Sequence, residues 1–200
     1  MRHQELRVLP GQTVDLATFP TRSDTAWEGS KQAGKERVKE LAKELSDLQK
    51  LYYADGSERL LVVLQAMDTG GKDSTIRDVF GRMNPQGVRV TSFKQPTHRE
   101  LAHDYLWRVH PHVPGDGEIT IFNRSHYEDV LVPRARGHQT RSEQQQRLGH
   151  IADFERMLSD EGTTIIKCYL HISIDEQRQR LQDRLDDPTK HWKFDYSDIR

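Results

Sequence analysis

Apolar residues in this chain recur with two different periods, which predict strands and helices in alternation. Residues 60–64 form a continuous apolar run, the pattern of a strand that is buried on both faces of a parallel sheet. Residues 88–93 alternate between apolar and polar and are rich in β-branched side chains, which predicts a second strand. Residues 119–122 and 163–172 are the remaining predicted strands.

Apolar residues spaced three and four positions apart predict the helices between these strands. The predicted helices cover residues 31–53, 76–83, 97–109, 140–161 and a charged segment that starts at 173. Two of them open with the capping box Thr-x-x-Glu, and the helix after Thr140 is expected to bury Leu148, Ile151, Phe154 and Leu158. Strands that alternate with helices predict an α/β fold, with a parallel sheet flanked by helices on both faces.

Composition narrows the class of protein. With 200 residues we expect an N-terminal arm over 1–30 and a single domain over 31–200. Charged residues make up 30% of the chain and no apolar run is long enough to span a membrane, so we expect a cytoplasmic protein without a membrane partner. The single cysteine, Cys168, excludes an intramolecular disulfide. A net charge of −1 argues against general nucleic-acid binding, and local clusters of arginine and lysine favour a polyanion in a groove.

A glycine-rich turn follows the predicted strand 60–64. Gly70, Gly71 and Lys72 lie between this strand and the helix 76–83. Glycines allow backbone N–H groups to approach an anion, a helix N-terminus adds partial positive charge, and Lys72 adds a full one. Phosphoryl chemistry is therefore the leading hypothesis, and a plain strand–turn–helix is the alternative.

The turn departs from the usual phosphate-loop pattern G-x-x-x-x-G-K-[ST]. Ala66 stands in place of the first glycine. Asp73 stands where the pattern has the hydroxyl residue that binds magnesium, and the nearest hydroxyl residues are the following Ser74 and Thr75. Asp68 lies inside the loop, where it would face a bound polyanion unless a metal ion lay between them. We therefore expect Asp68 to act as a metal ligand or as a base.

The predicted strand 119–122 runs directly into Asn123 and Arg124. Ligands of open α/β sheets lie beyond the carboxyl ends of the strands, so both side chains are expected in the crevice that holds Lys72. Arg124 suits a bidentate contact with phosphate, whereas Glu128 suits either magnesium or a nearby arginine. A simple turn over these residues is the alternative.

The charged segment 174–195 places Arg180 and Arg184 on one helical face and continues through Asp-Asp-Pro to Lys190. Basic helices of this kind close over transferring phosphates in many kinases. The segment is therefore either a lid over the site or a solvated, salt-bridged helix.

Taken together, these segments resemble the polyphosphate kinase 2 family. The resemblance rests on the blocks QAMDTGGKDSTI (65–76), NPQG (84–87), FNRSHYE (122–128) and RLDDPTKHWKF (184–194). Asn123, where other branches carry aspartate, makes the chain similar to the branch that phosphorylates AMP as well as ADP. The resemblance implies a P-loop-kinase-like fold with a helical lid, and it implies homo-oligomers. It also implies Mg²⁺-dependent transfer of the terminal phosphate of inorganic polyphosphate to AMP or ADP. This transfer is reversible, so ATP is a further expected partner.

The resemblance also implies roles for particular residues. Asp68 would organise the metal and the acceptor phosphate, and Lys72 and Arg124 would stabilise the transferring phosphoryl group. Asn123 and Arg184 complete the implied catalytic set. The implied phosphate-binding residues are Gly70, Gly71, Lys72, Asp73, Ser74, Thr75, Arg134, Arg180 and Lys190, and the implied metal ligands are Asp68 and Glu128.

Two other functions stay open. An ATP-dependent nucleoside monophosphate kinase shares the fold, although Ala66 and Asp73 count against it. A non-catalytic module that binds polyphosphate or nucleotide is the other alternative. Members of the family continue with helical sequence beyond the block 184–194, so this chain is expected either to be a fragment or to dispense with those C-terminal helices.

Overall fold

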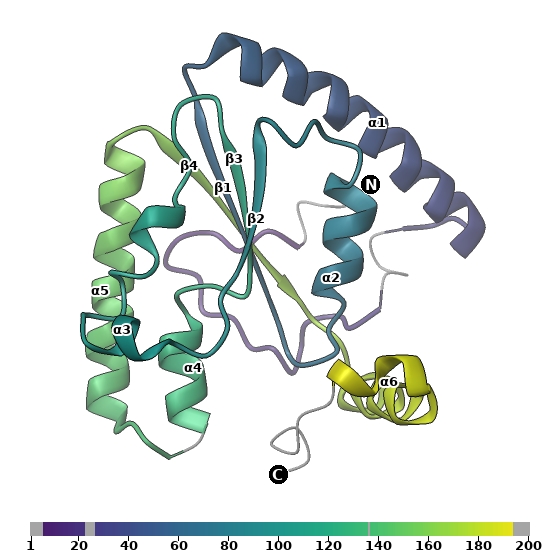
Figure 1. Ribbon diagram of the computed structural model, residues 1–200. Coiled ribbons are helices and arrows are strands. Elements are labelled where there is room, and N and C mark those ends of the chain that lie inside the picture. Colours follow the sequence, from purple (N-terminus) through teal and green to yellow (C-terminus); the bar gives the residue numbers. More distant parts are fainter. Residues whose placement is uncertain (1–5, 23–26, 136, 194–200) are drawn as a thin grey trace.

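The computed structural model describes residues 6–22, 27–135 and 137–193, and it shows four parallel strands with helices on both faces (Figure 1). The strands are β1 (Arg59–Ala66), β2 (Val88–Ser92), β3 (Ile119–Asn123) and β4 (Thr163–Leu170). Their order across the sheet is β2-β3-β1-β4, and every neighbouring pair is parallel. The predicted α/β fold with a covered parallel sheet is confirmed.

Strand β1 lies inside the sheet, between β3 and β4. Its residues 61–64 are all buried, which explains why the sequence shows a continuous apolar run there and no alternation. Leu64 pairs with Asn123, so the carboxyl ends of β1 and β3 lie side by side. The loops that follow these two strands therefore meet at one edge of the sheet.

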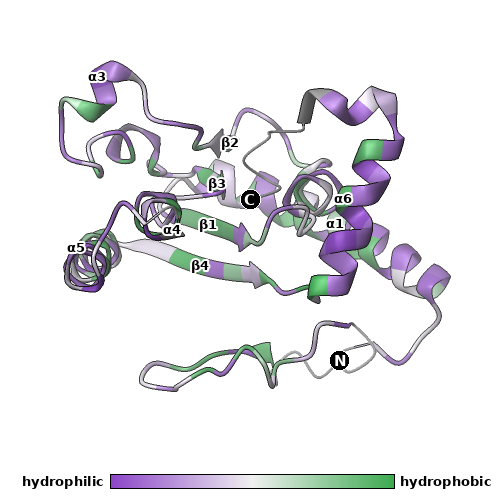
Figure 2. Cartoon of the chain, turned by 90° about the horizontal axis from the view of Figure 1, so that it is seen from below, coloured by the Kyte–Doolittle hydropathy of each residue, from purple (hydrophilic) through white to green (hydrophobic). Residues whose placement is uncertain are grey.

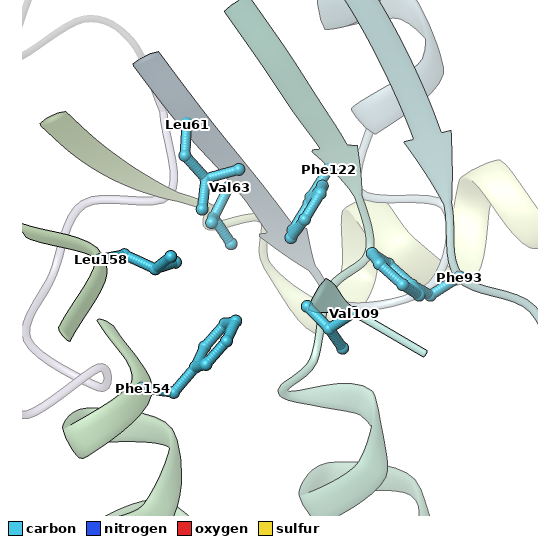
Figure 3. Packing of buried hydrophobic residues seen from close by; sticks show 7 residues of the cluster. All are labelled: Leu61, Val63, Phe93, Val109, Phe122, Phe154 and Leu158. Atoms are coloured by element: carbon cyan, nitrogen blue, oxygen red, sulfur yellow. The ribbon is translucent and has the colours of Figure 1, made fainter. Parts of the chain in front are cut away.

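One face of the sheet packs against α5 (Arg141–Asp160). Phe154 and Leu158 of this helix belong to the same core as Leu61 and Phe122 of the sheet (Figure 3). These side chains are at most 7% exposed. This core fixes α5 against the strands. Polar side chains of α5 that face the loops are therefore held in place as well.

The opposite face packs against α1 (Lys31–Asp55). Val62 and Leu64 point to this side because successive side chains of a strand alternate between faces, and they lie in one core with Leu45 of α1. The helix ends at Gly56, whose φ of 66° suits glycine and whose N–H bonds the carbonyl of the last turn. The predicted helix 31–53 is confirmed.

The last helix, α6 (Ile174–Asp186), lies beyond the carboxyl ends of β1 and β4 and leads into the 3₁₀ turn η5 (Pro188–Lys193) (Figure 2). Ser173 caps it by accepting a hydrogen bond from the N–H of Glu176, so the helix begins where the charged segment was predicted to start. None of its residues is buried. Among the helices of the described ranges, none is sufficiently long and apolar to cross a membrane.

The predicted helix 97–109 is wrong in its extent. Its capping box forms, but α3 (His98–Leu101) ends after one turn. The Asp104 carboxylate accepts hydrogen bonds from the N–H groups of Leu106 and Trp107 at 2.9 and 3.0 Å. This local bonding starts a separate turn and competes with a continuous helix. A short 3₁₀ helix, η4 (His110–His112), follows.

A helix that the sequence analysis missed, α4 (Glu128–Ala135), follows β3 after a short turn. It contains Pro133, which is unusual inside a helix and makes this segment hard to recognise as helical from the sequence. The helix after Thr140 is confirmed as α5, with both halves of its capping box present. The expected burial of Leu148 is wrong, because this side chain is 38% exposed.

Candidate active site

The loop after β1 has a backbone that requires its glycines. A Cβ on Gly70 would lie 2.4 Å from the Cβ of Ala66, and Gly71 adopts a φ of 96°. The chain then enters α2 (Lys72–Thr75) and a π-helical turn, η3 (Ile76–Phe80), so the helix begins earlier than the predicted residue 76. Strand, glycine turn and helix start form the phosphate cradle that the sequence predicts.

Lys72 lies at the centre of the charged groups. Its Nζ donates to the carbonyl of Ala66 at 3.3 Å. Burial lowers the pKa of Lys72, and the nearby positive charge of Arg124 lowers it further, whereas Glu128, Asp68 and Asp73 oppose the shift. These opposing influences show that the structure gathers both arginine and carboxylate side chains around one ammonium group.

The turn after β3 brings its polar residues to the same place. Asn123 donates from Nδ2 to the Asp73 carboxylate at 2.8 Å, which joins the two loops directly. Arg124 has a φ of 63°, and Thr69 in the first loop has a φ of 60°. Positive φ is uncommon for residues with a side chain, and such strain concentrates at functional sites. Both residues with positive φ other than glycine in the described ranges lie at this edge of the sheet.

Helix α6 contacts the first loop through one face. Arg184 pairs with the Asp68 carboxylate at 3.3 Å, and Arg180 donates to the carbonyl of Thr69 at 3.0 Å. Gln177 donates from Nε2 to the carbonyl of Asp68 at 3.2 Å. The sequence analysis missed Gln177, although its spacing of three and seven from the two arginines places it on their helical face.

Two of the predicted phosphate-binding residues, Arg134 and Lys190, form contacts outside the loop after β1. Arg134, on α4, donates to the carbonyl of Gln139 at 3.2 Å. Lys190, in η5, pairs with Asp187 at 2.7 Å, and this contact, together with hydrogen bonds from Thr189, lowers the pKa of Asp187 to about 2. Their binding roles stay predictions. The other predicted residues, Gly70, Gly71, Asp73, Ser74 and Thr75, all lie in the loop or in α2.

The two predicted metal ligands, Asp68 and Glu128, both influence Lys72. Across the ranges that the structure describes, no group of three or more His, Cys, Asp or Glu side chains is arranged to hold a metal. Magnesium commonly binds through one or two carboxylates together with substrate phosphates and water. The pair therefore fits a metal that binds with a phosphorylated substrate, and does not form a complete protein cage.

A cavity of about 490 Å³ adjoins the turn after β3, and Arg124 and Glu128 belong to its wall. Tyr105 is half-buried in the wall, whereas Phe93 and Arg108 are almost completely buried behind it. Arg108 donates to the carbonyl at position 94 at 2.7 Å and lies over the Phe93 ring. This cavity could not be predicted from the sequence, because its lining comes from separate segments around residues 93–108 and 124–147.

Known proteins similar to this chain agree with the geometry. Residues 28–200 match the sequence model of the family described as Polyphosphate kinase 2 (PPK2). An AMP/ADP-polyphosphate phosphotransferase of Meiothermus ruber is 57% identical, over 98% of this chain and 73% of that protein. An ADP-polyphosphate phosphotransferase of Rhodopseudomonas palustris is 41% identical, over 100% and 73% of the two chains.

A solved structure shares the fold closely. The crystal structure of Polyphosphate Kinase 2 from Arthrobacter aurescens TC1 superposes with a TM-score of 0.91 and 44% identity, over 98% of this chain and 70% of that chain. The sequence match and the fold thus point to the same family. The sequence blocks around Lys72, Arg124 and Arg184 are the ones that resemble this family. The chain belongs to the polyphosphate kinase 2 family.

Proposed function

We propose that this chain transfers the terminal phosphate of inorganic polyphosphate to AMP or ADP. The observation that carries the proposal is that Lys72, Arg124 and the arginine face of α6 converge on one edge of the sheet, in a member of this family. The names of the Meiothermus ruber and Rhodopseudomonas palustris relatives support polyphosphate as the partner in transfer and AMP or ADP as the nucleotide.

The loop after β1 suits a polyphosphate donor. A chain of phosphates carries negative charge along its whole length, and Lys72, Arg180 and Arg184 surround the loop with positive charge. Phosphoryl transfer needs little covalent chemistry from the protein, so positioning and charge neutralisation account for most of the catalysis. Lys72 and Arg124 are the groups that stabilise the transferring phosphoryl group in this proposal.

The cavity beside Arg124 suits the acceptor nucleotide. Its volume of about 490 Å³ lies in the range typical of small-ligand sites. Tyr105 is half-buried in its wall and can contact a base, and Arg124 belongs to the same wall and lies close enough to Lys72 to lower the pKa of that lysine. The acceptor phosphate would therefore face the terminal phosphate of the donor, as in-line transfer requires.

Magnesium, self-association and a cytoplasmic location belong to the same proposal. Asp68 and Glu128 would hold Mg²⁺, which when bound shields the negative charges of donor and acceptor from each other. In the protein alone, Arg184 neutralises the Asp68 carboxylate. Homo-oligomers and the cytoplasmic location are supported by the family resemblance and by composition.

The experiment that tests the proposal is an assay of the purified chain with long-chain polyphosphate, MgCl₂ and either AMP or ADP, with the nucleotides separated by chromatography. We expect ADP or ATP to form only when polyphosphate is present, and the Lys72→Met variant to form none. Transfer from ATP to AMP without any transfer from polyphosphate would instead establish a nucleoside monophosphate kinase.

A second variant distinguishes a kinase from a non-catalytic binding module. Asp68→Asn keeps the size of the side chain and removes its charge. A kinase with this substitution loses turnover, whereas a binding module shows no turnover in any variant and keeps its affinity for polyphosphate. Binding measured by calorimetry on both proteins, alongside the assay, distinguishes the two.

A further inference from the structure

A polar cluster, buried at its centre and open to solvent at Lys167, holds the turn that carries Arg124. At its centre is Glu155 of α5, whose carboxylate accepts hydrogen bonds from the Tyr127 hydroxyl at 2.9 Å and from Lys167 Nζ at 2.5 Å. His126 Nε2 lies 3.1 Å from the same carboxylate, and Lys167 also donates to the Tyr127 hydroxyl at 3.1 Å. We call these four residues the Glu155 cluster. It connects the turn after β3 to α5 and to β4.

The Glu155 cluster contains charges at a site where apolar residues would pack more simply. His126 is completely buried and Glu155 is 9% exposed. Burial favours the neutral carboxyl group, but hydrogen bonds from His126 and Lys167 outweigh it and hold the pKa of Glu155 below its ordinary value. Lys167, which pairs with Glu155, is half exposed, with 49% of its side chain accessible to solvent, so the ion pair is weak evidence for a role in stability. A role in geometry explains its presence better.

The cluster lies immediately after the strained residue. Arg124 adopts a left-handed backbone, and the next two residues, Ser125 and His126, are fully buried. The Ser125 hydroxyl accepts hydrogen bonds from Gln65 of β1 and from the N–H of Tyr127, each at 3.2 Å. The strained backbone is therefore fixed on one side to β1 and on the other side to Glu155. Residues held in sparsely populated conformations persist only where their surroundings impose them.

We propose that Glu155 is a positioning residue for phosphoryl transfer: through His126 and Tyr127 it holds Arg124 in the conformation that keeps its guanidinium group beside Lys72. The inference rests on the proposed function, and it adds a part of the molecule that contacts no phosphate. Glu155 acts through Arg124, so its removal affects the transition state more than the binding of either substrate.

The test uses Glu155→Gln, which keeps the size of the side chain and removes its charge. We expect kcat to fall about tenfold, since a small misplacement of a catalytic group has effects of this order or larger, while KM for polyphosphate changes by less than about twofold. The matched control is Leu158→Val, which alters the apolar core of the same helix one turn later. It lowers the melting temperature and leaves kcat unchanged.

A double-mutant cycle shows whether the effect passes through Arg124. In the Arg124→Ala background, Glu155→Gln should lower kcat by less than about twofold, because the group that it positions is already gone. An equal loss in both backgrounds would overturn the proposal, as would an unchanged kcat in Glu155→Gln alone. If Glu155→Gln does not fold, Tyr127→Phe removes one hydrogen bond of the cluster and enters the same cycle.

A second readout does not depend on the reaction. Arg124 is exposed, so trypsin can cleave after it once the turn loosens. Glu155→Gln should be cleaved at this bond several times faster than Leu158→Val, with both compared at the same distance below their melting temperatures. Equal cleavage would contradict the positioning role. An absence of polyphosphate transfer in the unsubstituted protein would contradict the proposed function, and this proteolysis test would still decide the role of Glu155.

Discussion

The two turns that meet at the active edge are held in place by different means. The loop after β1 is held by α6, through Gln177, Arg180 and Arg184, and no residue of that helix is buried. The turn after β3 is held by Ser125 and by the Glu155 cluster, and of these residues Ser125, His126 and Glu155 are buried. Elements with few buried contacts separate from a fold more readily than core elements do.

The difference assigns separate tasks to the two turns. We expect the turn with Arg124 to be preformed, because buried neighbours hold its strained backbone in the protein without a ligand. The loop with Lys72 is held by α6 in the protein alone, and in the proposed function the phosphates of the donor complete it. Substrate binding should therefore order the loop with Lys72 and leave the turn with Arg124 unchanged.

Of the variants that test this difference between the two turns, the one that removes the cation of the second turn is expected to have the largest effect. Arg124→Ala should lower kcat by about 10²–10³, the range found when a single group that stabilises transition-state charge is lost. The melting temperature should stay close to that of the unsubstituted protein, because the Arg124 side chain is exposed. Steady-state kinetics with AMP and polyphosphate measure the loss.

The control for this variant is Arg156→Ala, which removes an exposed arginine of α5 that pairs with Asp153. It should leave kcat unchanged. A similar loss in both variants would mean that general charge, and not the position of Arg124, matters.

A smaller effect is expected from loosening the contact between α6 and the loop. Arg184→Gln removes the partner of Asp68 and one positive charge at the loop, so KM for polyphosphate should rise about tenfold, with a smaller change in kcat. Arg178→Gln is the control, since Arg178 is exposed on the same helix and pairs with Asp175. If kcat fell and KM did not change in Arg184→Gln, α6 would act on the transition state and the comparison would fail.

The pH dependence of the reaction should show the lowered pKa of Lys72. The charged lysine is the active form, so kcat/KM should fall as pH rises through a value below the ordinary 10.5. Bound phosphates favour the ammonium form, so the corresponding limb of kcat should lie at higher pH. In the folded protein the buried charge is unfavourable, so this group's contribution to stability rises between the lowered pKa and the ordinary one.

A pH profile of Lys72→Arg provides the control for this prediction. Arginine stays protonated throughout the accessible range, so the limb should disappear while some activity remains. A limb that persists in this variant would belong to another group.

The smallest effect is expected from the strained backbone of the loop. Thr69→Gly should be about 1 kcal/mol more stable than Thr69→Ala, because glycine adopts a φ of 60° without the steric cost that a Cβ imposes. Chemical denaturation of the two variants measures the difference. Equal stability would mean that the backbone at Thr69 relaxes, and that the loop is not strained in solution.

The sequence predicted the parts of this molecule that depend on local patterns. The run 60–64, the glycine turn with Lys72 and the polar ending of the strand before Arg124 each lie in one short segment, and the topology of parallel sheets brings their ends together. The polyphosphate kinase 2 family was also predicted, and it is confirmed.

Other features depend on contacts between distant segments and could not be predicted in this way. The link from Glu155 to Tyr127 spans 28 positions, and no motif at either position marks it. Asp104 ends a helix through side-chain bonding that periodicity does not show, and Pro133 conceals another helix. Gln177 is different, because its helical spacing to Arg180 and Arg184 was available and was overlooked.

Hydrogen exchange with and without long-chain polyphosphate tests the central claim most directly. We predict that amides 123–130 are protected in the free protein and change little, whereas amides 67–75 exchange faster and gain protection when polyphosphate binds. Fast exchange over 123–130 in the free protein would contradict a preformed turn. Unchanged exchange over 67–75 at saturating polyphosphate would contradict the assignment of this loop as the donor site.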